Sequence, residues 1–138
     1  MRLNLYAMTV LTGAALLAMP PAQAQTVTLD GKVFVADAGE KGKPADEKND
    51  VITFAGGKFH SAACDQYGYT AGEYKHSAAG NAIAFEAQTQ SEKDGRLVWK
   101  GTVRGDEIEG TFVHYRKGWL LNPNPAPLEH WFKGKVKP

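Results

Sequence analysis

The sequence predicts an all-β protein: a single antiparallel up-and-down β-barrel of about eight strands, after a cleaved N-terminal signal peptide. Three observations support this fold class. Apolar and polar residues alternate along most of the chain after the first 24 residues, which is the period of β-strands. Glycine, asparagine and aspartate fill the breaks between the alternating runs. Beyond the N-terminal segment, no stretch has the period of a helix.

The N-terminal segment has the pattern of a secretory signal peptide. Arg2 provides an early positive charge, an apolar run follows from about residue 10 to residue 19, and Ala-Gln-Ala at 22–24 is a small-x-small cleavage motif. A pair of prolines stops the run short of the roughly 20 apolar residues that a membrane span needs. We therefore expect a signal peptide at 1–24 and a barrel domain at 25–138. We also expect export to the periplasm or the extracellular space, and no integral membrane segment after cleavage.

Composition and charge exclude some classes of partner. The chain has 138 residues and is 43% hydrophobic, which suffices for one core. Of the sixteen basic and fifteen acidic residues, only Arg2 lies in the leader, so fifteen of each remain. Such a balance gives no overall electrostatic footprint for nucleic acid or for an anionic membrane. The single cysteine, Cys64, cannot close an internal disulfide, so stability must come from the core.

Eight strands account for the alternating runs in chain order. They are expected at about 29–36, 50–55, 58–64, 72–77, 82–90, 96–104, 107–116 and 128–136. The pattern places one set of apolar side chains on the inner face: Ile83, Phe85, Ala87, Leu97, Trp99, Val103, Ile108 and Phe112. Closing such a meander into a barrel removes the exposed edges of an open sheet.

The connections between these strands predict two unequal ends. Three short turns, "AGGK", "AAGN" and "RGDE", fall at the same end of an up-and-down barrel. The opposite end receives the longer segments 37–49, 63–71 and 117–127 and the shorter "SEKDG". We refer to this opposite end as the mouth, and we expect a ligand to enter there because rigid strands hold variable loops around it.

The strand-opening "LDGKVF", followed by "ITF..GKF" and "W.GTV.GD.IEGT", resembles the small exported bacterial β-barrels of the lipocalin-like, or calycin-like, kind. The resemblance covers most of the chain after the leader at the level of strand pattern. It implies a lipocalin-like barrel and the binding of a small apolar or amphipathic molecule.

We expect an exported, non-catalytic protein that binds a small hydrophobic or amphipathic molecule at the mouth and needs no cofactor. The expected ligand-binding residues are aromatic or imidazole side chains: Tyr67, Phe85, Trp99, Phe112, His114, His130 and Phe132. The phenylalanines and the tryptophan would form an apolar wall, while the tyrosine and the histidines would orient a polar group. We expect no enzyme activity, because nearly all acidic residues fall on solvent-facing positions and no nucleophile has an evident base.

A metal site is the third alternative. In a regular strand at 58–64, His60 and Cys64 would face outward about 13 Å apart, too far to share a metal ion. Cys64, His114 and His130 nevertheless belong to the same end, and thiolate and imidazole are good ligands for zinc or copper. Against this, their spacing matches no standard metal motif.

The segment 118–131 supports a protein-interaction module as the second alternative. Trp119, Leu120 and Leu121 stand beside a proline-rich stretch and would suit a protein partner, or they fold back to plug the mouth. Glycines on the predicted inner face are also open to two interpretations. Gly101, Gly110 and Gly134 either leave room for a ligand or let the sheet coil tightly.

Overall fold

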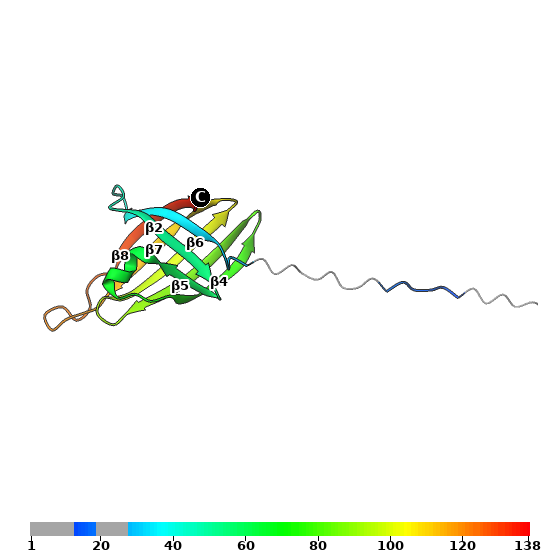
Figure 1. Ribbon diagram of the computed structural model, residues 1–138. Coiled ribbons are helices and arrows are strands. Elements are labelled where there is room, and N and C mark those ends of the chain that lie inside the picture. Colours follow the sequence, from blue (N-terminus) through cyan, green and yellow to red (C-terminus); the bar gives the residue numbers. More distant parts are fainter. Residues whose placement is uncertain (1–12, 19–27) are drawn as a thin grey trace, which may run out of the picture.

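The computed structural model describes residues 13–18 and 28–138 and has eight antiparallel strands in a closed barrel (Figure 1). Each strand pairs with its neighbours in sequence, and the last strand pairs with the first, as predicted. The strands are β1 (Val33–Glu40), β2 (Glu47–Ala55), β3 (Lys58–Ser61), β4 (Gly72–Ala79), β5 (Ala82–Ser91), β6 (Gly95–Arg104), β7 (Glu107–Arg116) and β8 (Leu128–Val136). A short 3-10 helix, η1 (Ala62–Tyr67), lies between β3 and β4.

Most of the expected signal peptide, 1–24, lies outside the described residues. The part within them, 13–18, is exposed and has no regular secondary structure. Across 13–18 and 28–138, no helix has both the length and the apolar character needed to cross a membrane.

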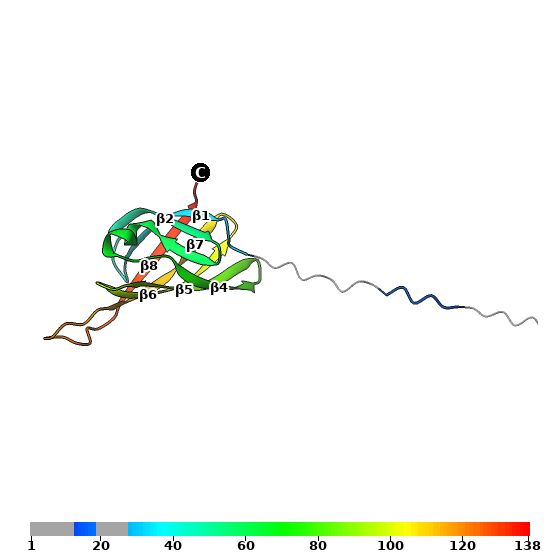
Figure 2. The ribbon, with the colours of Figure 1, turned by 60° about the horizontal axis from the view of Figure 1, so that its bottom comes forward.

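The two ends of the barrel differ as the turn sequences predict. Tight turns at 56–57, 80–81 and 105–106 join strands at one end, where Gly56, Gly80 and Gly105 adopt positive φ angles. At the mouth lie the longer connections 41–46, 62–71 and 117–127 and the shorter connection 92–94. The chain enters the barrel at the closed end, and the 117–127 connection projects from the opposite end (Figures 1 and 2).

Large apolar side chains fill the half of the interior next to the closed end. The ring of Phe54 packs edge-on against Phe34, Phe59 and Phe85, with centroids 6.1, 5.4 and 5.0 Å away. Leu29 is fully buried and covers this end of the core. Toward the mouth, several buried inner positions carry small or polar side chains instead: Ala38, Asp50, Ser61, Thr89 and Ser91. The interior is therefore packed at one end and less filled at the other.

Two glycines bring β6 and β7 close together. Phe85, Gly101, Gly110 and Phe132 pair in one row across β5 to β8, so all four share the inner face. A β-carbon on either glycine would lie 2.8 Å from the Phe132 ring. Of the two interpretations of these glycines, tight coiling is the one that fits, because aromatic rings occupy the space that they leave.

Several strand boundaries differ from the predicted ones. β1 ends at Glu40 rather than at about residue 36, β2 begins at Glu47 rather than at about residue 50, and β4 ends at Ala79 rather than at about residue 77. The first strand begins at Val33 rather than at about residue 29, because Gly31 turns the chain at a φ of 90° and its N–H donates to the carbonyl of Phe54 at 2.7 Å. The third strand ends at Ser61, and residues 62–67 turn into η1, which ends at Gly68 with a φ of 83°. A local pattern of four to eight residues does not specify such ends.

Candidate functional site

A cavity of about 330 Å³ opens at the mouth of the barrel. It lies above the packed aromatic core and between the connections 41–46, 62–71 and 92–94. Its lining combines apolar, aromatic, imidazole and carboxylate side chains: Ala38, Gly39, Asp46, Glu47, Asp50, Ser61, Ala63, Cys64, Tyr67, Tyr69, Asp94, Leu97, Trp99, Phe112, His114 and His130.

Three aromatic side chains in one row form the apolar wall of this cavity. Trp99 pairs with Phe112 across β6 and β7, and Phe112 pairs with His130 across β7 and β8, so all three point inward. The rings of Trp99 and Phe112 are 4.2 Å apart, and the imidazole of His130 stacks parallel on Phe112 at 4.5 Å. The indole N–H of Trp99 donates to Thr89 at 3.3 Å, which fixes the ring. The result is a preformed stack of flat surfaces.

The carboxylate of Asp94 joins two other side chains of the mouth. The hydroxyl of Tyr69 donates to Asp94 Oδ2 at 2.9 Å, and His114 Nε2 lies 3.1 Å from the same oxygen. Burial and the contact with Asp94 raise the pKa of Tyr69 above its usual range, so this hydroxyl stays protonated and keeps donating. The 92–94 and 62–71 connections are thus held together at one side of the cavity.

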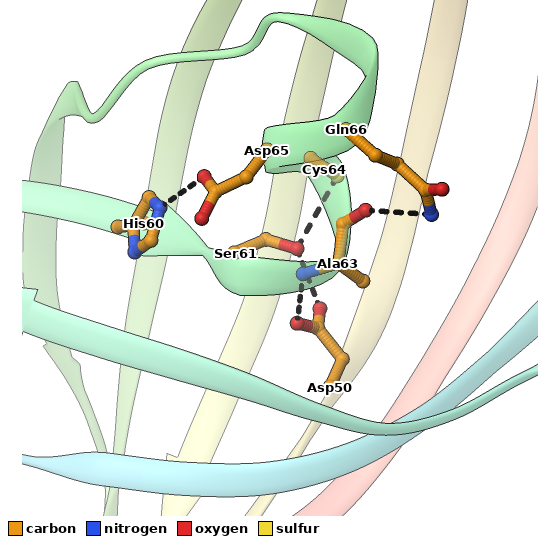
Figure 3. A network of polar contacts seen from close by, with 7 residues as sticks. All are labelled: Asp50, His60, Ser61, Ala63, Cys64, Asp65 and Gln66. Carbon is orange, nitrogen blue, oxygen red and sulfur yellow. Dashed lines mark hydrogen bonds and ion pairs between the residues drawn. The ribbon is translucent and has the colours of Figure 1, made fainter.

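Asp50 holds the start of η1, as Figure 3 shows. Its buried carboxylate accepts the hydroxyl of Ser61 at 2.5 Å and the backbone N–H of Ala63 at 2.9 Å. These two bonds explain why β3 stops and η1 begins, since the first turn of the helix is held by a carboxylate from β2. The hydroxyl of Ser61 also contacts the sulfur of Cys64 at 3.2 Å.

The surroundings of Cys64 differ from those predicted. It lies in η1 rather than at the end of a strand, and it lines the cavity rather than facing outward. His60 is not its partner, because the imidazole contacts Asp65 at 2.6 Å (Figure 3). Burial raises the pKa of the Cys64 thiol to about 11, and the nearby carboxylate of Asp50 adds to the shift. The thiol is therefore protonated at neutral pH.

We expect Cys64 to react slowly with thiol reagents. A pKa of about 11 makes the thiolate at pH 8 about a hundredfold scarcer than for an ordinary cysteine, and the thiolate is the reacting form. The rate of alkylation by iodoacetamide, followed by mass spectrometry, measures this directly. The same protein in concentrated urea provides the control and should react at the ordinary rate. Native and unfolded rates within a few-fold of each other would contradict the buried placement.

His130 contributes a buried nitrogen to the cavity. Within the described residues, its Nδ1 atom is shielded from solvent and has no hydrogen-bond partner. Burial lowers the pKa of this histidine below its usual value, so the imidazole is neutral at neutral pH. A bound molecule could therefore satisfy this nitrogen with one hydrogen bond.

The structure brings together five of the seven residues that the sequence predicts for ligand contact. Those five line the cavity: Tyr67, Trp99, Phe112, His114 and His130. Phe85 and Phe132 do face inward as predicted, but they belong to the packed core rather than to the cavity lining. The difference is depth along the barrel, which the alternation of a strand does not specify.

Among the cavity residues that escaped prediction are four whose side chains form hydrogen bonds there: Asp50, Ser61, Tyr69 and Asp94. Asp50 lies two residues before Ile52 and four before Phe54, which both face inward, so the strand alternation already indicated an inward side chain. Tyr69 and Asp94 lie in connections, where no period exists to indicate direction. The prediction that nearly all acidic residues face solvent is wrong for Asp50, which is buried, and Asp94 also lines the cavity.

The three residues of the metal alternative all line the cavity, but they do not form a metal-binding group. Over residues 13–18 and 28–138, no three histidine, cysteine or carboxylate side chains are grouped so that they could hold a metal ion. Each member has another neighbour instead: Cys64 contacts Ser61, His114 contacts Asp94, and His130 stacks on Phe112.

The charged side chains that line the cavity are all acidic. Asp46, Glu47, Asp50 and Asp94 all contribute to the lining, and it includes no lysine or arginine from the described part of the chain. Asp50 is neutralised in part by its two hydrogen-bond donors, whereas Asp46 is exposed to solvent. The cavity lining itself is therefore acidic, whereas Lys41, Lys43 and Lys93 stand in the connections that surround it.

A second, larger hollow of about 780 Å³ lies outside the barrel, over the outer faces of β4 to β8. It is open to solvent, and its charged lining mixes both signs, with Lys75, Lys100 and Lys133 beside Glu86 and Glu109. Such a surface lacks the enclosure and the convergent groups of a small-molecule site. The mouth cavity is the better candidate.

Fold and cavity together define a closed eight-stranded antiparallel barrel with an aromatic-walled cavity at its mouth, an architecture that fits a lipocalin-like fold. No protein-family model matches the chain, and neither a curated protein nor a solved structure matches it significantly.

Proposed function

We propose that this protein is an exported, non-catalytic carrier that binds a small amphipathic molecule in the mouth cavity. The observation that carries the proposal is the cavity itself: about 330 Å³, with stacked rings inside and carboxylates at its entrance. This volume falls at the lower end of the roughly 300–1,000 Å³ that small-molecule sites occupy. The leader pattern supports a place of action in the periplasm or outside the cell.

The apolar end of the ligand would lie against Trp99 and Phe112. Their rings, 4.2 Å apart and tilted by 31°, present a flat, rigid surface that loses little conformational freedom on binding. The neutral imidazole of His130 continues this surface and offers one polar nitrogen. A planar or aromatic group therefore suits this wall.

The polar end of the ligand would be a cation or a strong hydrogen-bond donor. Asp46, Glu47 and Asp94 line the cavity, and no lysine or arginine in the described lining opposes them. An anionic head group would meet like charges there, which costs binding free energy. A protonated amine on an apolar body satisfies both halves of the site.

Binding without chemistry is the activity that the contacts support best. The Cys64 thiol has Ser61 as its hydrogen-bond partner and a pKa of about 11, so it is not activated as a nucleophile. The Ser61 hydroxyl donates to Asp50 rather than to a histidine. The Nε2 atom of His114 contacts both the carboxylate and the backbone carbonyl of Asp94, and within the described residues it has no serine or cysteine partner.

A matched set of three probes tests the proposal. Phenethylamine, phenylethanol and phenylpropionate share an aromatic body and differ in the charge of the head group. Calorimetric titration should show the amine binding at least about tenfold more tightly than the carboxylate, with the alcohol between them. Ala38→Phe, which fills the cavity from β1, should abolish binding of all three.

The outcomes of this titration are distinct. Equal binding of the amine and the carboxylate would retain the cavity but remove the cationic preference. If none of the probes binds, and native mass spectrometry after incubation with a lipid extract finds no bound molecule, the ligand-binding function is wrong. Binding that survives Ala38→Phe would place the site elsewhere.

A further inference from the structure

A hairpin within the 117–127 connection carries the most exposed apolar side chains of the barrel domain. Trp119, Leu120 and Leu121 are 56%, 96% and 89% exposed. The 117–127 connection extends beyond the barrel as a narrow loop in both views (Figures 1 and 2), and Leu120 and Leu121 form the turn that Trp119 and Asn122 close. None of them lines the mouth cavity, so they do not plug it. We refer to residues 119–122 as the tip.

Hydrogen bonds and close packing hold the tip in a defined conformation. Trp119 and Asn122 exchange two backbone hydrogen bonds of 3.0 Å, which close its turn. Gly118 lies so close to Pro123 that a β-carbon there would be 1.9 Å from the Pro123 carbonyl oxygen. The guanidinium of Arg116 donates to the carbonyl of Ala126 at 2.9 Å and joins the two arms. Exposure of two leucines on a braced turn requires a function, since monomeric surfaces seldom present such a group.

We propose that the tip inserts into the interfacial region of a lipid bilayer and docks the barrel on a membrane. Three apolar side chains on a narrow convex hairpin offer too little area for a stable protein interface, which buries about 800 Å² on each partner. A bilayer requires only that apolar side chains reach below the head groups. Tryptophan favours that boundary, because its ring is apolar and its N–H is polar.

The charge of the hairpin indicates which lipids it would meet. Between 116 and 128 there are two basic residues, Arg116 and Lys117, and no acidic residue. Both stand at the base of the hairpin, where Arg116 donates to the carbonyl of Ala126 and Lys117 to that of Glu92, so their charges lie fixed behind the tip. Although the chain is nearly neutral overall, this element is locally cationic, which favours anionic lipids.

The position of the tip sets the orientation of the docked protein. The hairpin leaves the barrel at the same end as the connections that surround the cavity. A barrel docked by the tip therefore turns its mouth toward the bilayer, from which an amphipathic molecule could enter. Membrane docking does not depend on whether the cavity binds a ligand, and the two properties can fail separately.

Vesicle co-sedimentation of the protein without its leader tests the inference. We expect binding to phosphatidylcholine vesicles that contain about one-third phosphatidylglycerol, and weaker binding to pure phosphatidylcholine. Leu120→Ser with Leu121→Ser should reduce partitioning at least about tenfold, since two buried leucine side chains are lost. Both leucines are exposed, so the fold should be unaffected, as circular dichroism can verify.

A matched control and a second readout make the result decisive. Ala55→Ser with Ala79→Ser, at exposed positions near the closed end, should bind vesicles like the wild type. Trp119 emission should shift to the blue on vesicles, and the shift should vanish in Trp119→Phe. Absent vesicle binding, or equal binding by the serine variant, overturns the inference. Self-association that the serine variant abolishes, without any vesicle binding, would assign the tip to a protein interface instead.

Discussion

Replacing Gly110 with valine is expected to destabilise the barrel by about 4 kcal/mol or more, which is a large share of the roughly 5–15 kcal/mol that stabilises a folded domain. A β-carbon at this position would lie 2.1 Å from the carbonyl oxygen of Lys100 and 2.6 Å from the α-carbon of Gly101. Both atoms belong to the backbone of the paired strand β6, so no side-chain movement relieves the clash. The two strands must separate at the row where they are closest.

Thermal and urea unfolding, followed by circular dichroism, measure this effect. Thr111→Val is the matched control, because it places the same side chain one residue further along the same strand on the exposed outer face. We expect the control to unfold close to the wild type. A Gly110→Val protein that melts within a few degrees of the wild type would show that β6 and β7 are further apart than described.

Replacing Trp99 with alanine is expected to lower the free energy of unfolding by about 3–5 kcal/mol. Trp99 is 2% exposed, and its ring lies between the packed core and the cavity. It contacts Phe59 and Phe132 on the core side, with centroids 4.8 and 5.5 Å away, and Phe112 on the cavity side. Truncation removes these contacts and joins the new space to the cavity above, so the surrounding rings cannot collapse to fill it.

The chain offers a control of the same residue type. Trp119→Ala at the exposed tip makes the same chemical change outside the core, and we expect it to alter stability by less than about 0.5 kcal/mol. Urea titrations of both variants give the comparison. Equal losses for the two tryptophans would mean that the floor of the cavity does not carry the stability assigned to it.

The alternation of the strands was enough to predict the barrel and the direction of most side chains. Trp99, Phe112 and Phe132 face inward as the alternation requires. Tight glycine turns occur at one end only, and this distinguishes the closed end from the mouth. These features are local, because each follows from the pleat of one strand or the φ angle of one turn. A regular β-meander is the kind of fold for which local signals suffice.

The cavity could not be predicted in the same way, because its position depends on the combined volume of inner side chains from different strands at each depth of the barrel. Phe85 and Phe112 have the same parity, yet only Phe112 reaches the cavity. Cys64 was misplaced because the carboxylate of Asp50, from another strand, ends β3 and turns the chain into η1. Whether Leu120 and Leu121 cover the mouth or project from it is likewise set by hydrogen bonds within the hairpin, not by their hydrophobicity.

Closure by the first and last strands affects the order in which the chain can fold. β8 pairs with both β7 and β1, and its contact between Val136 and Phe34 spans roughly a hundred residues, which gives the fold a high contact order. A ribosome that has not yet released the last strand leaves the nascent sheet with two unpaired edges. The barrel therefore gains its full stability only once β8 has left the ribosome. Such late closure agrees with the export proposed above, since a chain that crosses a membrane through a secretion channel is threaded unfolded and folds afterwards.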